Sequence, residues 1–119
     1  MKKVSLRDKF DLIDEMWSPK IVGELNGQQV KLAKLQGEFV WHRHDNEDEL
    51  FLVWRGRLLI KLRDRDVRLE EGELFVVPRG VEHKPVAESE VQVLLLEPEG
   101  TLNTGNVRDE RTSPDPEWI

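Results

Sequence analysis

The chain has 119 residues, of which 38% are hydrophobic, and this is enough apolar side chain for one compact core but not for two. Its 18 basic and 24 acidic residues give a net charge of −6 and are interleaved, so no basic stripe exists and nucleic-acid binding is not expected. No apolar stretch approaches the roughly 20 residues of a membrane span, and the N-terminus lacks the apolar run of a secretory signal, so we expect a soluble, cytoplasmic protein with no membrane partner.

Residues 1–20 are predicted to form a short amphipathic helical segment that packs on the rest of the chain. Ser5 can cap a helix, with Asp8 three residues later. Apolar residues then recur at helical spacing, namely Leu6, Phe10, Ile13 and Trp17. Ser18-Pro19 is expected to end the helix, because the residue before a proline is pushed out of the helical region.

Residues 21–105 carry the pattern of an all-β domain. Ile21–Leu25 and Gln28–Leu35 flank Asn26-Gly27, a pair that suits a two-residue hairpin turn. From Val40 onward, short apolar runs are separated by regular breaks, and this spacing is typical of a sandwich or barrel. The breaks are Gly56, residues 63–66, Glu71-Gly72, Pro78-Arg79-Gly80 and residues 88–90. Residues 106–119 form a polar tail with two prolines, predicted to be a strap or a disordered end.

The run Glu49 to Trp54 is apolar on both alternating faces after its first residue, so both sides of this strand must be covered. Phe51 and Val53 would fill the barrel on one side. The opposite set is Leu50, Leu52 and Trp54, which is too apolar to face water. We expect a homodimer to cover it, with the N-terminal helix as the alternative cover.

The three histidines and one glutamate are the candidate metal ligands. Alternate residues of a strand share a face, so His42 and His44 can reach one ion, although such a pair taken alone is more often a surface or core feature. Glu49 opens an apolar stretch, where its burial is costly without a cation or a partner, and the other reading places it in an exposed acidic turn. His83 follows the Pro78-Arg79-Gly80 turn and could equally be a loop residue. Since the chain has no cysteine, a metal site must use imidazole and carboxylate.

Taken together, these spacings resemble the two motifs of the cupin family. The first motif is matched by His42-x-His44, four residues, Glu49, six residues and Gly56; the second by Gly72, five residues, Pro78-x-Gly80, two residues and His83. The resemblance implies a single double-stranded β-helix, or jelly-roll barrel, in which these three histidines and Glu49 hold one divalent metal ion. Two positions depart from the family pattern: Gly37 lies five instead of six residues before His42, and Ala87 replaces a frequent asparagine. The chain also resembles a subgroup of small cupins labelled after mannose-6-phosphate isomerase, over residues 17–26 and 97–105.

Three imidazoles and a carboxylate suit Fe, Mn, Ni, Co or Zn, and the sequence does not choose among them. A metal with open positions predicts a small-molecule ligand and favours a metalloenzyme, an isomerase or a dioxygenase, acting on an oxygen-rich, sugar-like or enol substrate. A non-catalytic binding or sensing module and a structural barrel with a vestigial site are the alternatives. By alternation, Glu38 shares the face of His42 and is a weak candidate base, and Lys34 is a weak candidate anchor if Gly37 does not break the pattern. The competing interpretation is that both residues are ordinary polar side chains on the exposed face of a strand.

Overall fold

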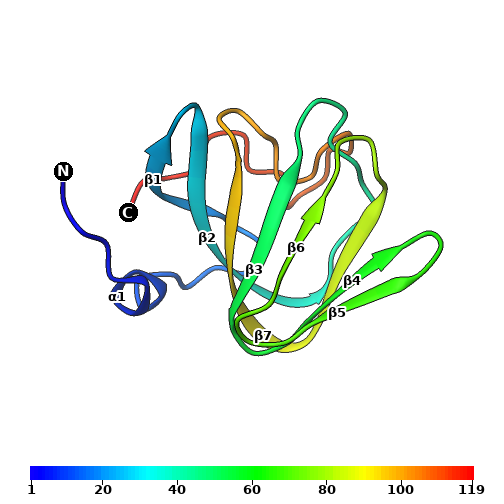
Figure 1. Ribbon diagram of the computed structural model, residues 1–119, viewed down its shortest axis with the longest axis horizontal. Coiled ribbons are helices and arrows are strands. Elements are labelled where there is room, and N and C mark those ends of the chain that lie inside the picture. Colours follow the sequence, from blue (N-terminus) through cyan, green and yellow to red (C-terminus); the bar gives the residue numbers. More distant parts are fainter.

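The computed structural model describes residues 1–119 as one short helix and seven strands, which confirms the predicted all-β fold (Figure 1). The elements are α1 (Leu6–Phe10), β1 (Lys20–Leu25), β2 (Gln28–Glu38), β3 (Glu49–Arg55), β4 (Leu58–Leu62), β5 (Asp66–Leu69), β6 (Leu74–Val77) and β7 (His83–Pro98). All strand pairs are antiparallel, in the order β1-β2-β7-β3-β6, and β4 pairs with both β5 and β7. The one helix, α1, has five residues, which is far short of a membrane span.

Strand β7 closes the barrel because it belongs to two parts of the sheet (Figure 1). Its first residues, His83–Val86, pair with β4, and the stretch after residue 90 pairs with both β2 and β3. The predicted break at residues 88–90 is therefore wrong: this exposed segment lies within one strand, next to a shift in its pairing with β2. Pairing of the flanking residues, Ala87 with Gly37 and Val91 with Leu35, carries the strand through a sequence that alone suggests a turn.

The hairpin between β1 and β2 turns at Asn26-Gly27, as predicted. Both residues have positive φ values, 49° and 78°, which a type I′ turn requires. Leu25 pairs directly with Gln28 across the turn. This register places Ala33 and Leu35 in the barrel core and Leu32 on the opposite face, in a smaller cluster with Phe10 and Ile13.

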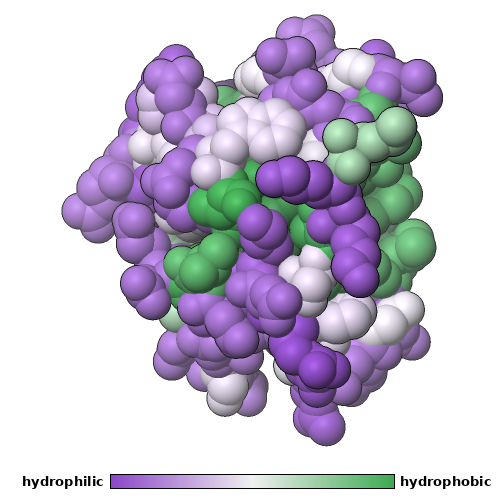
Figure 2. Space-filling view, turned by 90° about the vertical axis from the view of Figure 1, so that its left-hand side faces the viewer, coloured by the Kyte–Doolittle hydropathy of each residue, from purple (hydrophilic) through white to green (hydrophobic).

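The N-terminal helix is shorter than its apolar periodicity predicts. Ser5 caps it, since the Asp8 backbone N–H donates to Ser5 Oγ at 3.3 Å, but the helix ends at Phe10. Farther along, the Trp17 backbone N–H donates to the Lys34 carbonyl oxygen at 2.8 Å, and Trp17 has a left-handed φ of 61°. Pairing with the edge of β2 thus replaces helix in this part of the segment. The side of the molecule that carries this segment is mostly hydrophilic, with apolar side chains near its middle and along one edge (Figure 2).

The polar tail is a strap along the barrel. Ile119 N–H donates to the Ile21 carbonyl oxygen at 3.1 Å, and Lys9 Nζ donates to the Ile119 carbonyl oxygen. Arg111 reaches the Glu38 carbonyl oxygen at 2.8 Å and lies over the ring of Phe39. Of the two interpretations of residues 106–119, the structure has the strap.

Candidate metal centre

The four predicted ligand residues meet at one point inside the barrel. His42 and His44 lie in the connection between β2 and β3, Glu49 is the first residue of β3, and His83 is the first residue of β7. All four side chains are buried, and one ligand atom from each lies within 4.8 Å of the others. The structure thus brings together residues that are up to 41 positions apart in the sequence.

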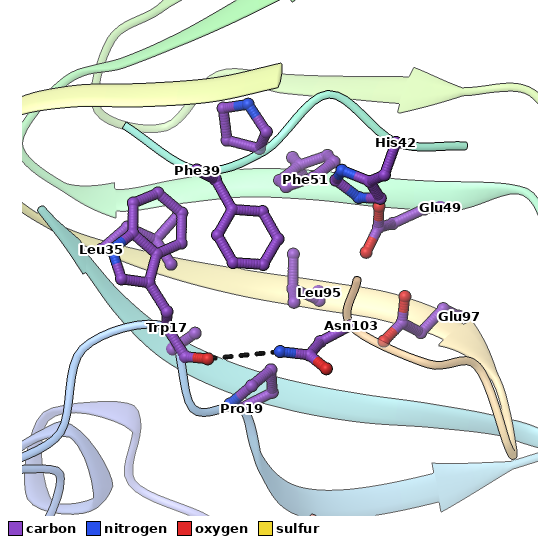
Figure 3. Close-up of a pocket in the computed structure, with 12 residues that line it drawn as sticks. Trp17, Pro19, Leu35, Phe39, His42, Glu49, Phe51, Leu95, Glu97 and Asn103 are labelled. Carbon is purple, nitrogen blue, oxygen red and sulfur yellow. Dashed lines mark hydrogen bonds between the residues drawn. The ribbon is translucent and has the colours of Figure 1, made fainter. Parts of the chain in front are cut away.

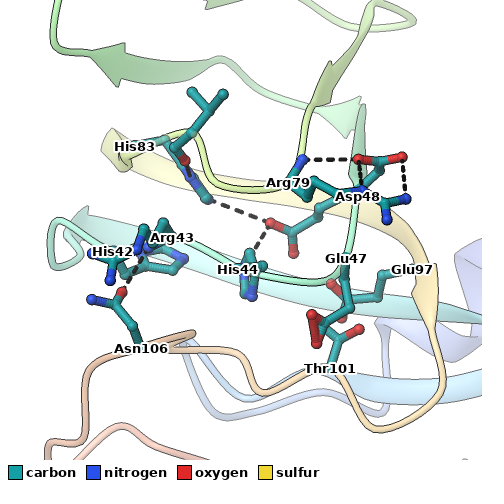
Figure 4. A network of polar contacts seen from close by, with 12 residues as sticks. His42, Arg43, His44, Glu47, Asp48, Arg79, His83, Glu97, Thr101 and Asn106 are labelled. Atoms are coloured by element: carbon teal, nitrogen blue, oxygen red, sulfur yellow. Dashed lines mark hydrogen bonds and ion pairs between the residues drawn. The ribbon is translucent and has the colours of Figure 1, made fainter.

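Backbone hydrogen bonds fix the segments that carry these side chains. His42 and His83 exchange two backbone hydrogen bonds, of 3.0 and 2.9 Å, and the Gly80 N–H donates to the His44 carbonyl oxygen at 2.8 Å. Arg79, in the turn before His83, also donates to the carboxylate of Asp48, next to Glu49, through its backbone N–H at 2.8 Å and its guanidinium at 3.3 Å (Figure 4). The two motifs of the sequence are therefore joined by main-chain contacts as well as by the ligand side chains.

Two of the imidazoles are oriented by carbonyl groups behind them. Nδ1 of His42 lies 2.9 Å from the Val40 carbonyl oxygen, and Nδ1 of His83 lies 2.9 Å from the Val81 carbonyl oxygen. A carbonyl oxygen can only accept, so each Nδ1 carries the proton. Each Nε2 is then an acceptor available to a cation, which is how metal-binding histidines are commonly held.

The centre of this cluster holds buried polar atoms without hydrogen-bond partners. His44 Nε2, His83 Nε2 and Glu49 Oε1 have none, although Glu49 Oε1 lies 3.3 and 3.5 Å from the two nitrogens (Figure 4). Buried polar groups are almost always satisfied, because an unpaired one costs about 1–3 kcal/mol. A cation at the meeting point would satisfy all three atoms at once, so the donor set fits a divalent metal ion.

The electrostatics of the cluster are those of a cation site. Burial, together with the neighbouring His83, lowers the pKa of His42 to about 4, so its imidazole is neutral at pH 7. Burial also acts against a charged His44, but the carboxylate of Glu49 outweighs burial and raises the pKa of His44. Burial alone would raise the pKa of Glu49, whereas contacts with His44 and His83 hold it well below its usual range. Glu49 is therefore an ionised, buried carboxylate, which positive charge beside it stabilises.

A turn that precedes the strap presses against the ligand segment. Asn106 bonds Arg43, which lies between the two histidines, from both sides: its Oδ1 accepts from the Arg43 N–H at 2.8 Å, and its own N–H donates to the Arg43 carbonyl oxygen at 3.0 Å (Figure 4). Gly105 has a φ of 57°, and a Cβ there would lie 2.2 Å from the Arg43 carbonyl oxygen and 3.1 Å from the ring of His42. Only glycine fits this approach.

A cavity opens beside the cluster. It has room of about 40 Å³ for small molecules, and its walls are mostly apolar. Figure 3 shows the carboxyl groups of Glu49 and Glu97 at one end and the rings of Trp17 and Phe39 toward the other. The two rings are stacked, with centroids 4.6 Å apart, and Trp17 Nε1 donates to the Gln36 carbonyl oxygen at 2.9 Å. A small molecule in this cavity would contact the cluster at His42 and Glu49.

One residue of the cavity wall, Glu97, belongs to a buried ion pair that the sequence analysis missed. Lys31 Nζ donates to Glu97 Oε1 at 2.9 Å, and each residue is 1% exposed. Burial and the nearby charge of Glu49 raise the pKa of Glu97 well above its usual range, and Lys31 offsets them only in part. The available signal was alternation, because Lys31 occupies the same strand face as Ala33 and Leu35.

The two weak catalytic candidates are not brought to the cluster. The side chain of Glu38 is 65% exposed and pairs with Lys84 at 2.8 Å. Lys34 is half-buried and alternates with Ala33 and Leu35, which places it on the face of Leu32, outside the cavity. A β-bulge between Leu35 and Gly37 interrupts the alternation on which the prediction depended.

Comparison with known proteins agrees with the family that the sequence motifs resemble and with the fold of the structure. Residues 28–97 match the family described as the cupin domain. The structure is similar to the crystal structure of a cupin-2 domain containing protein from Shewanella frigidimarina, with 46% identity and a TM-score of 0.79 over 81% of this chain and 94% of the other. A crystal structure of a protein from Neisseria meningitidis is similar at 30% identity, with a TM-score of 0.76 over 82% of this chain and all of the other.

Among curated proteins, the uncharacterized protein YdbB of Bacillus subtilis is 38% identical over 64 residues, which are 53% of this chain. The match spans 57% of the length of that relative.

Proposed function

The chain belongs to the cupin family, and from that premise we propose that it holds one divalent metal ion, Fe, Mn, Ni, Co or Zn, on His42, His44, Glu49 and His83. We propose further that it is an enzyme for a small, oxygen-rich substrate of the sugar-like or enol kind, in which isomerisation or dioxygenation takes place beside the ion.

One observation carries this proposal: three buried atoms without partners, His44 Nε2, His83 Nε2 and Glu49 Oε1, converge next to a cavity. A set of histidines that only stabilised the core would be paired within the chain. The apolar walls of the cavity keep water away from the bound molecule, and this strengthens electrostatic interactions inside it.

The ligand residues and the residues that line the cavity would have different roles. A bound divalent ion would polarise an oxygen atom of the substrate and stabilise negative charge that develops on it. The carbonyl groups of Val40 and Val81 hold the imidazoles of His42 and His83 in orientation. Glu49, as a carboxylate, lowers the net positive charge at the centre. Phe39 and Leu35 line the side of the cavity on which the substrate carbon atoms would lie.

A second candidate function is a non-catalytic, metal-dependent binding or sensing module. The position of Glu38 favours it, since this predicted base is exposed and paired with Lys84 outside the cavity. That leaves few acid or base side chains beside the ligand cluster.

The two candidates are separated by one series of measurements. Elemental analysis of the purified protein should find close to one divalent metal ion per chain. Keto-sugars, enols and catechol-like compounds are then offered to the Fe, Mn, Ni, Co and Zn forms, in air and without oxygen. Turnover that a chelator abolishes and one metal restores supports the enzyme; tight binding without turnover in every form supports the binding module. Protein without bound metal, which also fails to take up any of the five ions, refutes both.

We also propose that the chain forms a homodimer through the outer face of β3 and β6. Leu50 pairs with Val76 and Leu52 with Leu74, and the last two, Val76 and Leu74, are 45% and 56% exposed. Contiguous apolar surface of this kind is typical of interaction sites. Light scattering coupled to gel filtration should report twice the chain mass, and the double variant L74E/V76E should elute as a monomer; a monomeric wild type at high micromolar concentration would refute the dimer.

A further inference from the structure

The Lys31–Glu97 pair stands at the end of the cavity nearest the ligand cluster (Figure 3). Glu97 lies on β7 and lines the cavity together with His42 and Glu49. Lys31 lies on β2 behind it and donates to Glu97 Oε1 at 2.9 Å, with the Thr101 carbonyl oxygen 3.5 Å away. The ammonium group therefore holds the carboxyl group in one orientation from the side opposite the cavity.

This arrangement leaves the second oxygen of Glu97 without a partner. Glu97 Oε2 is buried and has no hydrogen-bond donor of the chain within reach, and the carboxyl group beside it is that of Glu49. The side chain is 1% exposed, so bulk water does not satisfy it either. An oriented, buried and unpaired oxygen at the wall of a cavity is a binding group for whatever enters the cavity.

A contribution to folding stability does not explain why the Lys31–Glu97 pair is present. A buried ion pair is on average no more stabilising than two apolar residues of the same size, because both charges lose their hydration. Here the pair also leaves one oxygen unsatisfied, which adds to the cost. A contribution to ligand recognition explains both its position and its incomplete pairing.

We propose that Glu97, oriented by Lys31, is a second anchor of the cavity and exchanges a hydrogen bond with a hydroxyl group of the molecule bound at the candidate metal centre. This inference rests on the proposed function. It narrows the ligand class to small compounds that carry a metal-binding oxygen pair and, farther along the molecule, at least one free hydroxyl group.

A hydroxyl group is the partner that fits this position in either state of Glu97. A hydroxyl can both donate and accept, so it pairs with a carboxylate and with a carboxylic acid. A carboxylate at this end of the ligand would be repelled by an ionised Glu97, whereas a carboxylate at the metal centre is attracted by the cation. The apolar part of the cavity, at Phe39 and Leu95, would then contact the C–H groups of the same molecule.

The test uses two probes that differ by one hydroxyl group. Lactate and glycerate share an α-hydroxy carboxylate, which can bind a metal ion, and glycerate carries one further hydroxyl. Both are titrated calorimetrically into the metal-loaded full-length protein. The variants are K31M/E97L, which removes both buried charges at similar volume, and E97Q. R57M/E70L is the matched control, because Arg57 and Glu70 form an exposed ion pair at 3.0 Å outside this cavity. Thermal unfolding verifies that each variant folds.

Wild type and the control should bind glycerate about tenfold more tightly than lactate, the size of one hydrogen bond to a charged or strongly polar group. K31M/E97L should lose this preference while it retains the metal, and E97Q should reduce it. Three outcomes would overturn the anchor without affecting the metal site. Wild type could bind the two probes equally, the loaded protein could bind neither probe, or the preference could survive in K31M/E97L. A variant that loses metal affinity but keeps the preference would show that the pair supports Glu49 instead. Failure of wild type to bind any divalent metal would overturn the proposed function itself.

Discussion

Two sets of buried polar side chains share the interior of this barrel, and they are arranged in opposite ways. In the ligand cluster, His42, His44, Glu49 and His83, three atoms face one another with no hydrogen-bond partner. In the Lys31–Glu97 pair, a positive and a negative group meet at 2.9 Å and neutralise each other. Lys31 satisfies one oxygen of Glu97 within the chain, whereas the cluster needs a cation from outside. Removing a member should therefore have different consequences in the two sets.

The largest effect is expected from His83→Ala. Loss of one buried ligand should weaken metal binding more than about 100-fold, since loss of an outer-shell partner alone costs 10–100-fold. Elemental analysis after gel filtration should find almost no metal in this variant. Asp45→Asn is the control, because Asp45 is an exposed acid in the same connection as His42 and His44. Full metal content after removal of both His42 and His83 would refute the ligand assignment.

In the Lys31–Glu97 pair, the single variants should be worse than the double variant. Lys31→Met or Glu97→Leu alone leaves an uncompensated buried charge, and each should cost about 3–5 kcal/mol of unfolding free energy. K31M/E97L should lie within about 1 kcal/mol of wild type, since two apolar residues replace two desolvated charges. Urea denaturation of the four proteins forms a double-mutant cycle. Additive single effects would mean that the two side chains do not depend on each other.

The third prediction concerns pH and the metal-free protein. His42 has a pKa of about 4 in the folded chain and about 6.5 when unfolded, so the unfolded state binds more protons between these values. The contribution of His42 to the free energy of unfolding is complete above pH 6.5 and is lost as the pH drops toward 4. The loss is about 3 kcal/mol, since each unit of pKa difference is worth about 1.4 kcal/mol.

His44, whose folded pKa is raised, acts in the opposite direction, so the comparison is made with His42→Asn. Urea midpoints of chelator-treated wild type should fall more steeply between pH 6.5 and 4 than those of His42→Asn. Parallel profiles for the two proteins would contradict the buried, neutral state of His42.

The smallest effect is expected at Gly105, which supports the ligand cluster from outside. Gly105→Ala should cost about 2–3 kcal/mol and weaken metal binding, because its Cβ meets the Arg43 carbonyl oxygen. Gly100→Ala is a matched control: its φ is also positive, at 85°, but no atom lies within 4 Å of the added Cβ. It should cost only about 1 kcal/mol from backbone strain and leave metal binding unchanged. Equal metal affinity in the two variants would mean that the turn does not position the histidines.

Much of this architecture is readable from the sequence, for reasons that differ between its parts. The Asn26-Gly27 hairpin follows from local backbone preference, since both residues tolerate positive φ. The four ligand residues follow from motif spacing, because turn lengths fixed by Gly56 and by Pro78-Arg79-Gly80 determine where the strands place them. Strand β6, Leu74–Val77, lies between two of the predicted breaks, Glu71-Gly72 and Pro78-Arg79-Gly80.

What the sequence did not predict depends on long-range pairing. The helix ends at Phe10 and later residues pair with β2, and residues 88–90 stay within β7 because the residues on either side of them pair with β2. The bulge near Gly37 shifts the alternation of β2, so Lys31 and not Lys34 points into the barrel interior. A shift of one residue exchanges the faces of a strand, and no local signal fixes where a bulge falls.

The stacked rings of Trp17 and Phe39, which line the cavity, give the protein an optical readout. Trp17 stacks on Phe39, and the edge of Phe39 meets His42 with ring centroids 5.4 Å apart, so an indole stands two aromatic contacts from the candidate metal centre. A paramagnetic or coloured ion in the cluster should quench the fluorescence of that indole. Titration of Co or Ni should therefore dim the emission of wild type, and Trp17→Phe should lose most of this response while it binds the same ion. The chain thereby reports the occupancy of its own site without an added label.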